Sequence, residues 1–243
     1  MSAEGIASFS KKAAAYEKGR PRYSPAAMEF IFSNPDLKPE MVVADIGAGT
    51  GLLTKDLESR FDRVFAIEPN DDMRAALGKE ALGGTAERTG LPDASVDVIF
   101  AAQAFHWFDI DEARREFRRI LRSPKRVFLL WNSRVSEAGT GAAEIDALMN
   151  AMKPARDRTL EADPVAIAKF FETERVMCTE FENSTFLTKE NLISMVLSRS
   201  YAPKSGEPGF DALVTRVGDI FDRHAMYGEL EIPYRTQVYS GVL

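Results

Sequence analysis

Residues 41–51, MVVADIGAGTG, decide the fold of this chain because an apolar run passes directly into alternating glycines. A run that is apolar nearly throughout is typical of a parallel strand covered on both faces. Glycines at every second position let the backbone turn sharply and let a ligand approach without meeting a Cβ atom. Leu53 and Leu57 then show the i, i+4 spacing of a helix. The stretch predicts a strand, a ligand-binding loop and a helix, with a tight turn lacking any ligand as the alternative.

Strands and helices alternate outward from this unit through the first half of the chain. β-Branched runs predict strands at 63–68, 95–102 and 125–132, and a glycine-weakened run predicts a short one near 81–86. Residues 109–122 predict a solvated outer helix, with acids in its first turn and arginines near its end. This alternation predicts an α/β fold with an open, mostly parallel sheet and helices on both faces.

The two flanking regions have a different pattern. Ser24 is expected to cap a helix that begins at Pro25, and residues 140–172 are expected to be helical with breaks at Pro154 and Pro164. Later elements are a strand at 176–186, helices at 188–200 and 208–226, and a strand at 229–242 that closes the sheet antiparallel. We expect a single domain, 1–243, made of a helical N-terminal lid (1–34), a cofactor-binding core (35–135), and helical cap segments with closing strands (136–243).

Composition and charge exclude several classes of protein. The 243 residues are 45% apolar and 28% charged, as in a globular protein with a substantial core. The 31 basic and 37 acidic residues give a net charge of -6, which provides no global attraction to nucleic acid or anionic lipid. One cysteine and two histidines exclude an internal disulfide and disfavour a metal site. With neither a secretory signal nor a membrane span apparent, we expect a cytoplasmic protein, and no pattern specifies its oligomeric state.

Two carboxylates near the glycine loop favour one ligand over another. Asp45 stands two residues before Gly47, where it would repel the pyrophosphate of a dinucleotide but attract a positively charged ligand. The loop spacing is also G-x-G-x-G rather than the G-x-G-x-x-G of dinucleotide-binding folds. S-adenosylmethionine carries an ammonium and a sulfonium, so we favour it over NAD. Glu68, at the end of the second strand, is placed to accept hydrogen bonds from ribose hydroxyls.

Further motifs occur in the order that is typical of one enzyme family. They are VADIGAGTGLLT (43–54), EPNDDM (68–73), GTAE with PDASVD (84–97), AAQAFHWFD (101–109) and YEKGRPRY (16–23). With these motifs the chain resembles class I S-adenosylmethionine-dependent methyltransferases of the type 11 group, which includes trans-aconitate and quinone-biosynthesis methyltransferases. PYRT (233–236) is similar to the last strand of one subgroup. Thr89-Gly90 departs from a common Leu-Pro pair, and Thr85 departs from a common acid.

The resemblance implies a Rossmann-like sheet of seven strands, the last antiparallel, that binds S-adenosylmethionine as cofactor. Pro69 and Met73 are expected to flank the adenine, with backbone groups of Ala86 and Glu87 at its edge. The complete set of expected cofactor-binding residues is Asp45, Gly47, Ala48, Gly49, Gly51, Glu68, Pro69, Met73, Ala86, Glu87, Gln103 and Arg20. Arg20 is included because a guanidinium can pair with the cofactor's carboxylate; the alternatives are an arginine that pins the lid or one that holds an acidic acceptor.

The acceptor side of the site is less defined by the sequence. His106 is the candidate general base if the acceptor must lose a proton, and a residue that shapes the pocket wall otherwise. Tyr16, Tyr23, Phe105 and Trp107 are expected to line the substrate pocket, although apolar residues at strand ends also form cores. We expect methyl transfer to an O, N or C atom of a small molecule. The alternatives are a protein that binds S-adenosylmethionine without catalysis and, less favoured, an NAD(P)-dependent oxidoreductase.

Overall fold

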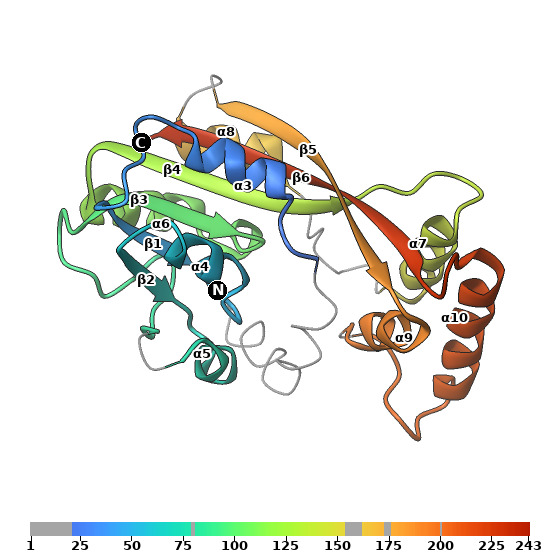
Figure 1. Cartoon of the computed structure of the whole chain (residues 1–243). Helices are drawn as coiled ribbons and strands as arrows, with labels where there is room; N and C mark the ends of the chain where they lie inside the picture. The colour runs from blue at the N-terminus through green and yellow to red at the C-terminus, as the bar shows by residue number, and fades with distance from the viewer. Residues whose placement is uncertain (1–20, 79–80, 154–161, 173–175, 200) are drawn as a thin grey trace.

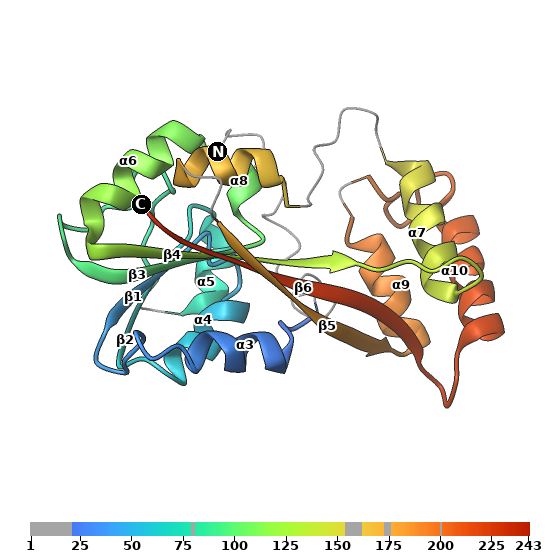
Figure 2. The same ribbon diagram turned by 90° about the horizontal axis from the view of Figure 1, so that it is seen from above.

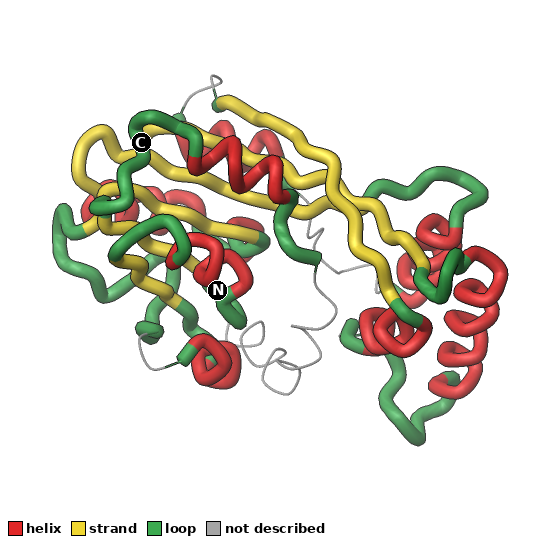
Figure 3. Tube along the Cα trace, in the orientation of Figure 1, coloured by secondary structure: helices red, strands yellow, loops and turns green. Residues whose placement is uncertain are grey.

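A computed structural model describes residues 21–78, 81–153, 162–172, 176–199 and 201–243 (Figure 1). Strands and helices alternate along the chain, and the strands lengthen after the first half (Figure 3). The strands are β1 (Val42–Ile46), β2 (Arg63–Ile67), β3 (Val96–Ala102), β4 (Leu121–Arg134), β5 (Met177–Leu187) and β6 (Leu230–Val242). The helices are α3 (Pro25–Phe32), α4 (Leu52–Glu58), α5 (Asp71–Leu77), α6 (Ile110–Ile120), α7 (Gly141–Met152), α8 (Pro164–Phe171), α9 (Lys189–Leu197) and α10 (Phe210–His224), with a 3-10 turn η1 (Phe105–Trp107).

Within the described residues, six strands form one sheet in the order β2-β1-β3-β4-β6-β5. Strands β1 to β4 are parallel, and β6 runs antiparallel to both of its neighbours, β4 and β5. The predicted α/β class, the mostly parallel sheet and the antiparallel last strand are therefore confirmed. The strand order reverses at β1, and ligands of open α/β sheets bind at the carboxyl ends beside such a reversal.

The short strand predicted near 81–86 is reduced to a single parallel bridge between Ile67 and Leu82. The Leu82 N–H donates to the Ala66 carbonyl (2.9 Å), and the Leu82 carbonyl accepts from the Glu68 N–H (3.1 Å). Two glycines follow, and a turn at 85–88 then ends the extended chain. The described residues consequently contain six strands rather than the seven predicted.

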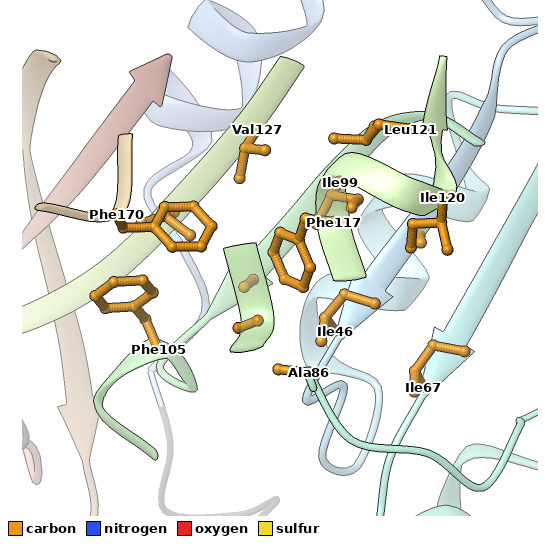
Figure 4. Packing of buried hydrophobic residues seen from close by; sticks show 14 of the residues in the cluster. Ile46, Ile67, Ala86, Ile99, Phe105, Phe117, Ile120, Leu121, Val127 and Phe170 are labelled. Atoms are coloured by element: carbon orange, nitrogen blue, oxygen red, sulfur yellow. The ribbon is translucent and has the colours of Figure 1, made fainter. Parts of the chain in front are cut away.

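Helices cover both faces of the sheet (Figure 2). On one face, α3 and α4 pack over Phe100 and Phe128. On the other face, α6 and α8 bury an aromatic cluster that includes Phe117 and Phe170 (Figure 4). Ser24 is the N-cap residue of α3 and Pro25 is its first residue, as predicted, but the Ser24 side chain makes no capping hydrogen bond. Its backbone N–H donates instead to a side chain of β6, which fixes the start of α3 against the sheet.

Strands β4, β5 and β6 extend past the core and carry a second group of helices. β4 has 14 residues and begins directly after α6, so it is longer than the predicted strand at 125–132. Helices α7, α9 and α10 pack together at the far ends of these strands (Figures 1 and 2), around Ile145, Leu192 and Phe221. We call α7, α9 and α10 the cap. The predicted break at Pro164 is confirmed, because α8 begins there and covers the core, whereas Pro154 lies outside the described residues.

Glu116 on α6 ties down the loop that precedes β3. Its carboxylate is 9% exposed and accepts hydrogen bonds from the Thr89 N–H (2.8 Å), the Thr89 hydroxyl (2.6 Å) and the Arg119 guanidinium (2.7 and 2.8 Å). Burial alone would raise the pKa of Glu116, but the hydrogen bonds from Arg119 and Thr89 outweigh it and lower the pKa to about 2. The threonine that departs from the family pattern at position 89 thus has a structural role.

Replacing Glu116 by Gln is expected to lower the free energy of unfolding by about 1–3 kcal/mol at pH 7, because hydrogen bonds to a charged group are lost. The folded-state pKa lies below the unfolded value, so this stabilisation is complete above about pH 4.5 and is lost as the pH falls toward 2. Urea unfolding at pH 7 and pH 3.5 measures the difference. Glu112→Gln, at an exposed acid of the same helix, is the control. A difference that is the same at both pH values would contradict this account.

Candidate functional site

The loop between β1 and α4 contains three glycines with positive φ angles, Gly47 (75°), Gly49 (61°) and Gly51 (86°). A Cβ atom on Gly47 would lie 2.5 Å from the Cβ of Ala104, and one on Gly51 would lie 2.5 Å from the Cδ2 of Leu77. By contrast, no described atom lies within 4 Å of a Cβ built on Gly49. Packing therefore requires glycine at 47, the positive φ angle favours it at 51, and the space beside Gly49 is open to a ligand.

Asp45 lies on β1 directly before this loop and is almost completely buried, with 1% of its surface exposed. Its Oδ2 accepts a hydrogen bond from the Thr54 hydroxyl on α4 (2.7 Å). Burial raises the pKa of Asp45 to about 7, against the opposing effect of the Thr54 hydrogen bond, and the charge of Glu68 adds to the rise. A nearby positive charge would offset this desolvation, so the site electrostatically favours a cationic ligand.

Glu68, directly after β2, joins two turns through its carboxylate. Its Oε2 accepts from the Gly49 N–H (2.8 Å), and its Oε1 accepts from the Asn70 N–H (2.9 Å). The Arg74 guanidinium donates to the Glu68 carbonyl (2.7 Å). Burial raises the pKa of Glu68, with the two backbone hydrogen bonds and the Arg74 charge opposing the rise. The carboxylate is thus fixed beside the glycine loop, and each oxygen retains a further lone pair for a ligand hydroxyl.

Neighbouring turns bring the remaining predicted cofactor residues to the same edge of the sheet. The Ala48 N–H donates to the carbonyl at the end of β2 (3.1 Å). Met73 is buried in the first turn of α5, after the half-buried Pro69. Ala86 is buried against the core (Figure 4), and the Glu87 carboxylate accepts from the Asp109 N–H (2.9 Å). These residues lie around the carboxyl ends of β1 and β2, where the sequence motifs predict the cofactor to bind.

Gln103 ends β3 with an unusual backbone conformation, because its φ angle is +54° although it is not a glycine. Its side-chain Nε2 donates to the Asn132 carbonyl on β4 (3.0 Å). Non-glycine residues with positive φ are concentrated at functional sites. The 3-10 turn η1 follows directly, and the rings of His106 and Trp107 lie there half-buried with their centroids 5.1 Å apart. The candidate base and one predicted pocket residue therefore lie in the turn that follows Ala104, the residue that packs against Gly47.

Two other predicted pocket residues lie in the core. Phe105 is 3% exposed and packs edge-on against Phe170 and Trp131, with ring centroids 5.2 and 6.0 Å away (Figure 4). Tyr23 is 6% exposed and belongs to the cluster under α3. Both side chains are buried among core residues, and their predicted part in lining a substrate pocket stays a prediction. Tyr16 and Arg20 lie outside the described residues.

Some residues around the site escaped the sequence analysis. Thr54, whose hydroxyl donates to Asp45, is the last residue of the motif VADIGAGTGLLT (43–54). The sequence therefore contained the residue within a recognised motif but did not indicate that it bonds Asp45. Asn132, Asn183 and Thr236 form hydrogen bonds to one another across β4, β5 and β6. They are far apart in the chain, and only Thr236 belongs to a quoted motif. Their proximity depends on the sheet order.

Comparison with known proteins agrees with the geometry. A family profile described as a methyltransferase domain matches residues 44–129. An uncharacterized methyltransferase of Mycobacterium tuberculosis (strain H37Rv) is 36% identical over 237 residues, which cover 94% of this chain and 93% of the relative. The chain belongs to this methyltransferase family. It is a class I methyltransferase, and its cofactor is S-adenosylmethionine.

More distant relatives share parts of this methyltransferase. The malonyl-(acyl-carrier protein) O-methyltransferase 1 of Coxiella burnetii is 35% identical over 101 residues, 39% of this chain and 33% of that protein. Among solved structures, a type II methyltransferase candidate from Anaeromyxobacter dehalogenans superposes with a TM-score of 0.66 at 19% identity, over 92% of this chain and 97% of that one. An S-adenosylmethionine-dependent methyltransferase from Aquifex aeolicus superposes with a TM-score of 0.51 at 14% identity, and the alignment covers 100% of both chains. Both similarities show the common fold.

Two features of other protein classes are not found in the part of the chain that the structure describes. None of its helices is long and apolar enough to cross a membrane. Nor do histidine, cysteine, aspartate and glutamate side chains gather there in groups that would hold a metal ion.

The residues at this edge fit S-adenosylmethionine in shape and charge. Gly49 leaves open space beside a backbone that carries no side chain, and Asp45 supplies a buried negative charge whose raised pKa indicates incomplete compensation. Glu68 offers carboxylate oxygens beside the same loop. A ligand with a positive charge at one end and a ribose in the middle would satisfy both carboxylates.

Replacing Gly49 by Val is expected to weaken S-adenosylmethionine binding at least tenfold, because the new side chain would fill the open space beside the loop. Gly139→Val is a matched control, since Gly139 also has a positive φ (86°) and open surroundings but lies in the loop before α7. Both variants carry the same kind of backbone strain. Calorimetry should show weaker binding for Gly49→Val alone, and equal affinities for the two variants would place the cofactor elsewhere.

Replacing Asp45 by Asn is expected to stabilise the ligand-free protein at high pH. The unfolded carboxyl has a pKa of 3.8, so between about pH 4 and pH 7 the folded protein retains a proton that the unfolded chain has released. The stability from this group is therefore present at low pH and is lost as the pH rises through about 7. We expect Asp45→Asn to raise the free energy of unfolding by about 1–3 kcal/mol at pH 8, with little change at pH 4.

Urea unfolding at both pH values checks this expectation, with Asp62→Asn, at an exposed acid, as the control. The same Asp45→Asn variant should bind S-adenosylmethionine more weakly at pH 8, because the negative charge is gone. An Asp45→Asn protein that is less stable than the parent at pH 8 would show that the buried charge is compensated within the fold.

Proposed function

We propose that this methyltransferase moves the methyl group of S-adenosylmethionine to an oxygen, nitrogen or carbon atom of a small molecule. The observation that carries the proposal is the open space beside Gly49, whose N–H donates to the Glu68 carboxylate, together with the buried carboxylate of Asp45 directly before the same loop. A loop without side-chain obstruction and with two negative groups suits a cofactor that is cationic at its methionine end. The neighbouring half-buried His106 and Trp107 provide a surface for an acceptor.

In this proposal each carboxylate has a separate task. Asp45 stabilises the positive end of the cofactor through its charge, and Glu68 accepts hydrogen bonds from the ribose hydroxyls. Gln103 continues this edge at the end of β3. The backbone and apolar contacts to the cofactor are assigned to Gly47, Ala48, Gly49, Gly51, Pro69, Met73, Ala86 and Glu87.

Arg20 is assigned to the carboxylate at the methionine end of the cofactor. Neither Asp45 nor Glu68 can neutralise that group, whereas a guanidinium pairs with a carboxylate through two parallel hydrogen bonds. Arg20 is joined to Pro21, whose carbonyl is hydrogen-bonded to the side chain of Asn132 on β4. That bond fixes the chain next to Arg20 at the edge of the sheet that carries the site.

The cofactor supplies an activated methyl group on a sulfonium, so the protein has to position the acceptor and exclude water. His106 and Trp107 project from the short turn that links β3 to α6. An imidazole there can accept a proton from a phenol or an amine as the acceptor is methylated, whereas a carboxylate acceptor needs no base. The chemical class of the acceptor therefore determines whether His106 acts as a base.

Two measurements test the function. Calorimetry with S-adenosylmethionine, NAD and NADP compares the proposed cofactor with the dinucleotides, and tight binding of a dinucleotide alone would favour an oxidoreductase. A turnover screen over carboxylic acids, phenols, quinone precursors and amines then follows the formation of S-adenosylhomocysteine. We expect turnover with at least one acceptor class. Tight cofactor binding with no turnover on any acceptor would favour a binding protein without catalysis.

Replacing His106 by Gln is expected to lower kcat about 100-fold if His106 is the base, because general base catalysis contributes a factor of this order. The affinity for S-adenosylmethionine should change little, and the acidic limb of the pH–kcat profile should disappear. His224→Gln is the control, since the other histidine of the chain lies on α10 and pairs with Glu144 (2.7 Å). A parental kcat with a raised acceptor KM would make His106 a residue that shapes the pocket.

A further inference from the structure

Arg74, on α5, folds back onto the turn that follows β2. Its Nη1 donates to the Glu68 carbonyl (2.7 Å), and its Nη2 donates to the carboxylate of Asp71. The Arg74 side chain is only 24% exposed, whereas that of Asp71 is 87% exposed. Ion pairs with exposed acids stabilise little, so the inward contacts of the guanidinium fix where it lies.

The guanidinium packs against the chain that runs beside β2. A Cβ atom built on Gly83 would lie 3.4 Å from the Arg74 Cζ and 3.5 and 3.7 Å from its Nη1 and Nη2. Because the central carbon is the nearest of the three atoms, the planar group lies face-on over Gly83. The preceding residue, Leu82, is bonded through its backbone to Ala66 and Glu68. Arg74 therefore joins α5, the end of β2 and the chain at 82–83.

Hydrogen bonds of this turn hold Glu68 at both its side chain and its backbone. The Glu68 Oε1 accepts from the Asn70 N–H (2.9 Å), and the Asn70 Oδ1 accepts from the Met73 N–H (2.9 Å). The Asn70 carbonyl accepts from the Arg74 N–H (2.9 Å), and the Arg74 side chain returns to the Glu68 carbonyl. Removing the Arg74 side chain would therefore release the peptide group from which the Glu68 side chain projects.

Arg74 also acts on Glu68 through its charge. Burial raises the pKa of Glu68, and the Arg74 charge opposes this rise together with two backbone hydrogen bonds. The charged group that faces Glu68 from β1 is Asp45, whose own pKa the Glu68 charge raises. Among the described residues, Arg74 is thus the cation that favours the ionised form of Glu68.

We propose that Arg74 is a positioning residue for the cofactor, which fixes the Glu68 turn and balances the Glu68 carboxylate so that both oxygens accept ribose hydroxyls. This inference rests on the function proposed above and assigns no contact between Arg74 and the cofactor. An ionised carboxylate has acceptor positions on both oxygens, whereas protonation turns one of them into a donor. Removing Arg74 is therefore expected to weaken the ribose contact, and to do so most strongly at acidic pH.

The test measures adenosine binding to the full-length protein by calorimetry between about pH 5 and pH 9. Adenosine contains the ribose but lacks the positive charges that Asp45 is proposed to attract, so it reports on Glu68. Arg74→Met removes the charge and the donors but keeps a long side chain, and Arg74→Lys keeps the charge. Arg60→Met is the matched control, because the half-buried Arg60 also donates to a backbone carbonyl, that of Leu37 (3.1 Å), in the turn that enters β2.

We expect Arg74→Met to bind adenosine about tenfold more weakly at pH 7, a loss of the size that a hydrogen bond with a charged partner produces. In the parent, the affinity should fall as the pH decreases and Glu68 takes up a proton. This fall should begin at a higher pH in Arg74→Met, because the pKa of Glu68 rises further once the neighbouring positive charge is removed. Arg74→Lys should keep the parental pH profile, and Arg60→Met should keep both the affinity and the profile.

Glu68→Gln shows whether Glu68 is the group that titrates. Its side chain cannot release a proton, so this variant should lack the fall, and adding Arg74→Met to it should not change the pH profile. Urea unfolding measures the stability of each variant. If Arg74→Met folds poorly, Arg74→Gln provides the same comparison, because it also removes the charge.

A loss of adenosine affinity in Arg74→Met that is equal at every pH would overturn the positioning role and reduce Arg74 to a structural contact. An unchanged affinity in Arg74→Met, or a parental fall in Glu68→Gln, would overturn it as well. Each of these outcomes leaves the proposed function intact, provided that the parent binds S-adenosylmethionine. A parent protein that binds neither S-adenosylmethionine nor adenosine would overturn the proposed function itself.

Discussion

The site depends on the Glu68 carboxylate, which accepts one backbone N–H from each of two turns that belong to neighbouring strands. β1 and β2 are parallel and in register, with Ile46 opposite Ile67, so the chain leaves both strands at the same edge. Where two loops begin side by side, backbone N–H groups such as those of Gly49 and Asn70 no longer have partners in the sheet and need other acceptors. Glu68 satisfies both groups and thereby fixes the distance between the glycine loop and the turn that begins α5. The open space beside Gly49 is defined by this link.

Burying two carboxylates at one edge has an energetic consequence. Asp45 accepts a hydrogen bond from a hydroxyl, and no basic side chain among the described residues forms an ion pair with it. Its raised pKa results from burial, which disfavours its charge. Glu116 is also buried, although less completely than Asp45, and it is paired with Arg119 and has a lowered pKa. The two acids differ in whether the fold itself supplies a compensating cation. At Asp45 the fold supplies no such cation, so a bound ligand can supply the positive charge. Residues with strongly shifted pKa values are concentrated at functional sites.

Much of the core was predictable because its signals are local. The apolar run of β1, the three glycines and the following helix lie within one short stretch, and Glu68 follows at the end of the next strand. Sequence patterns were less reliable where the structure of a segment depends on adjacent residues or on side chains far along the chain. Two glycines and a turn reduce the strand predicted near 81–86 to a bridge, and the burial of Phe105 depends on its contact with Phe170, which lies far along the chain. The link between Asn132 and Thr236 spans 104 residues, so no local pattern predicts it.

The position of β6 affects how the chain can fold. β6 comes last in chain order but lies inside the sheet, where it is the only described strand that pairs with β5. Until β6 inserts, β5 has no sheet partner, and the cap lacks the strand that brings Leu230, Ile232 and Tyr234 to its core. The parallel half of the sheet, by contrast, uses strands that are all present once β4 has been made. This topology gives the molecule high contact order at its C-terminal end, which slows the closing step. During synthesis the cofactor-binding half can therefore form early, while the cap and the edge strand remain incomplete until β6 has been made.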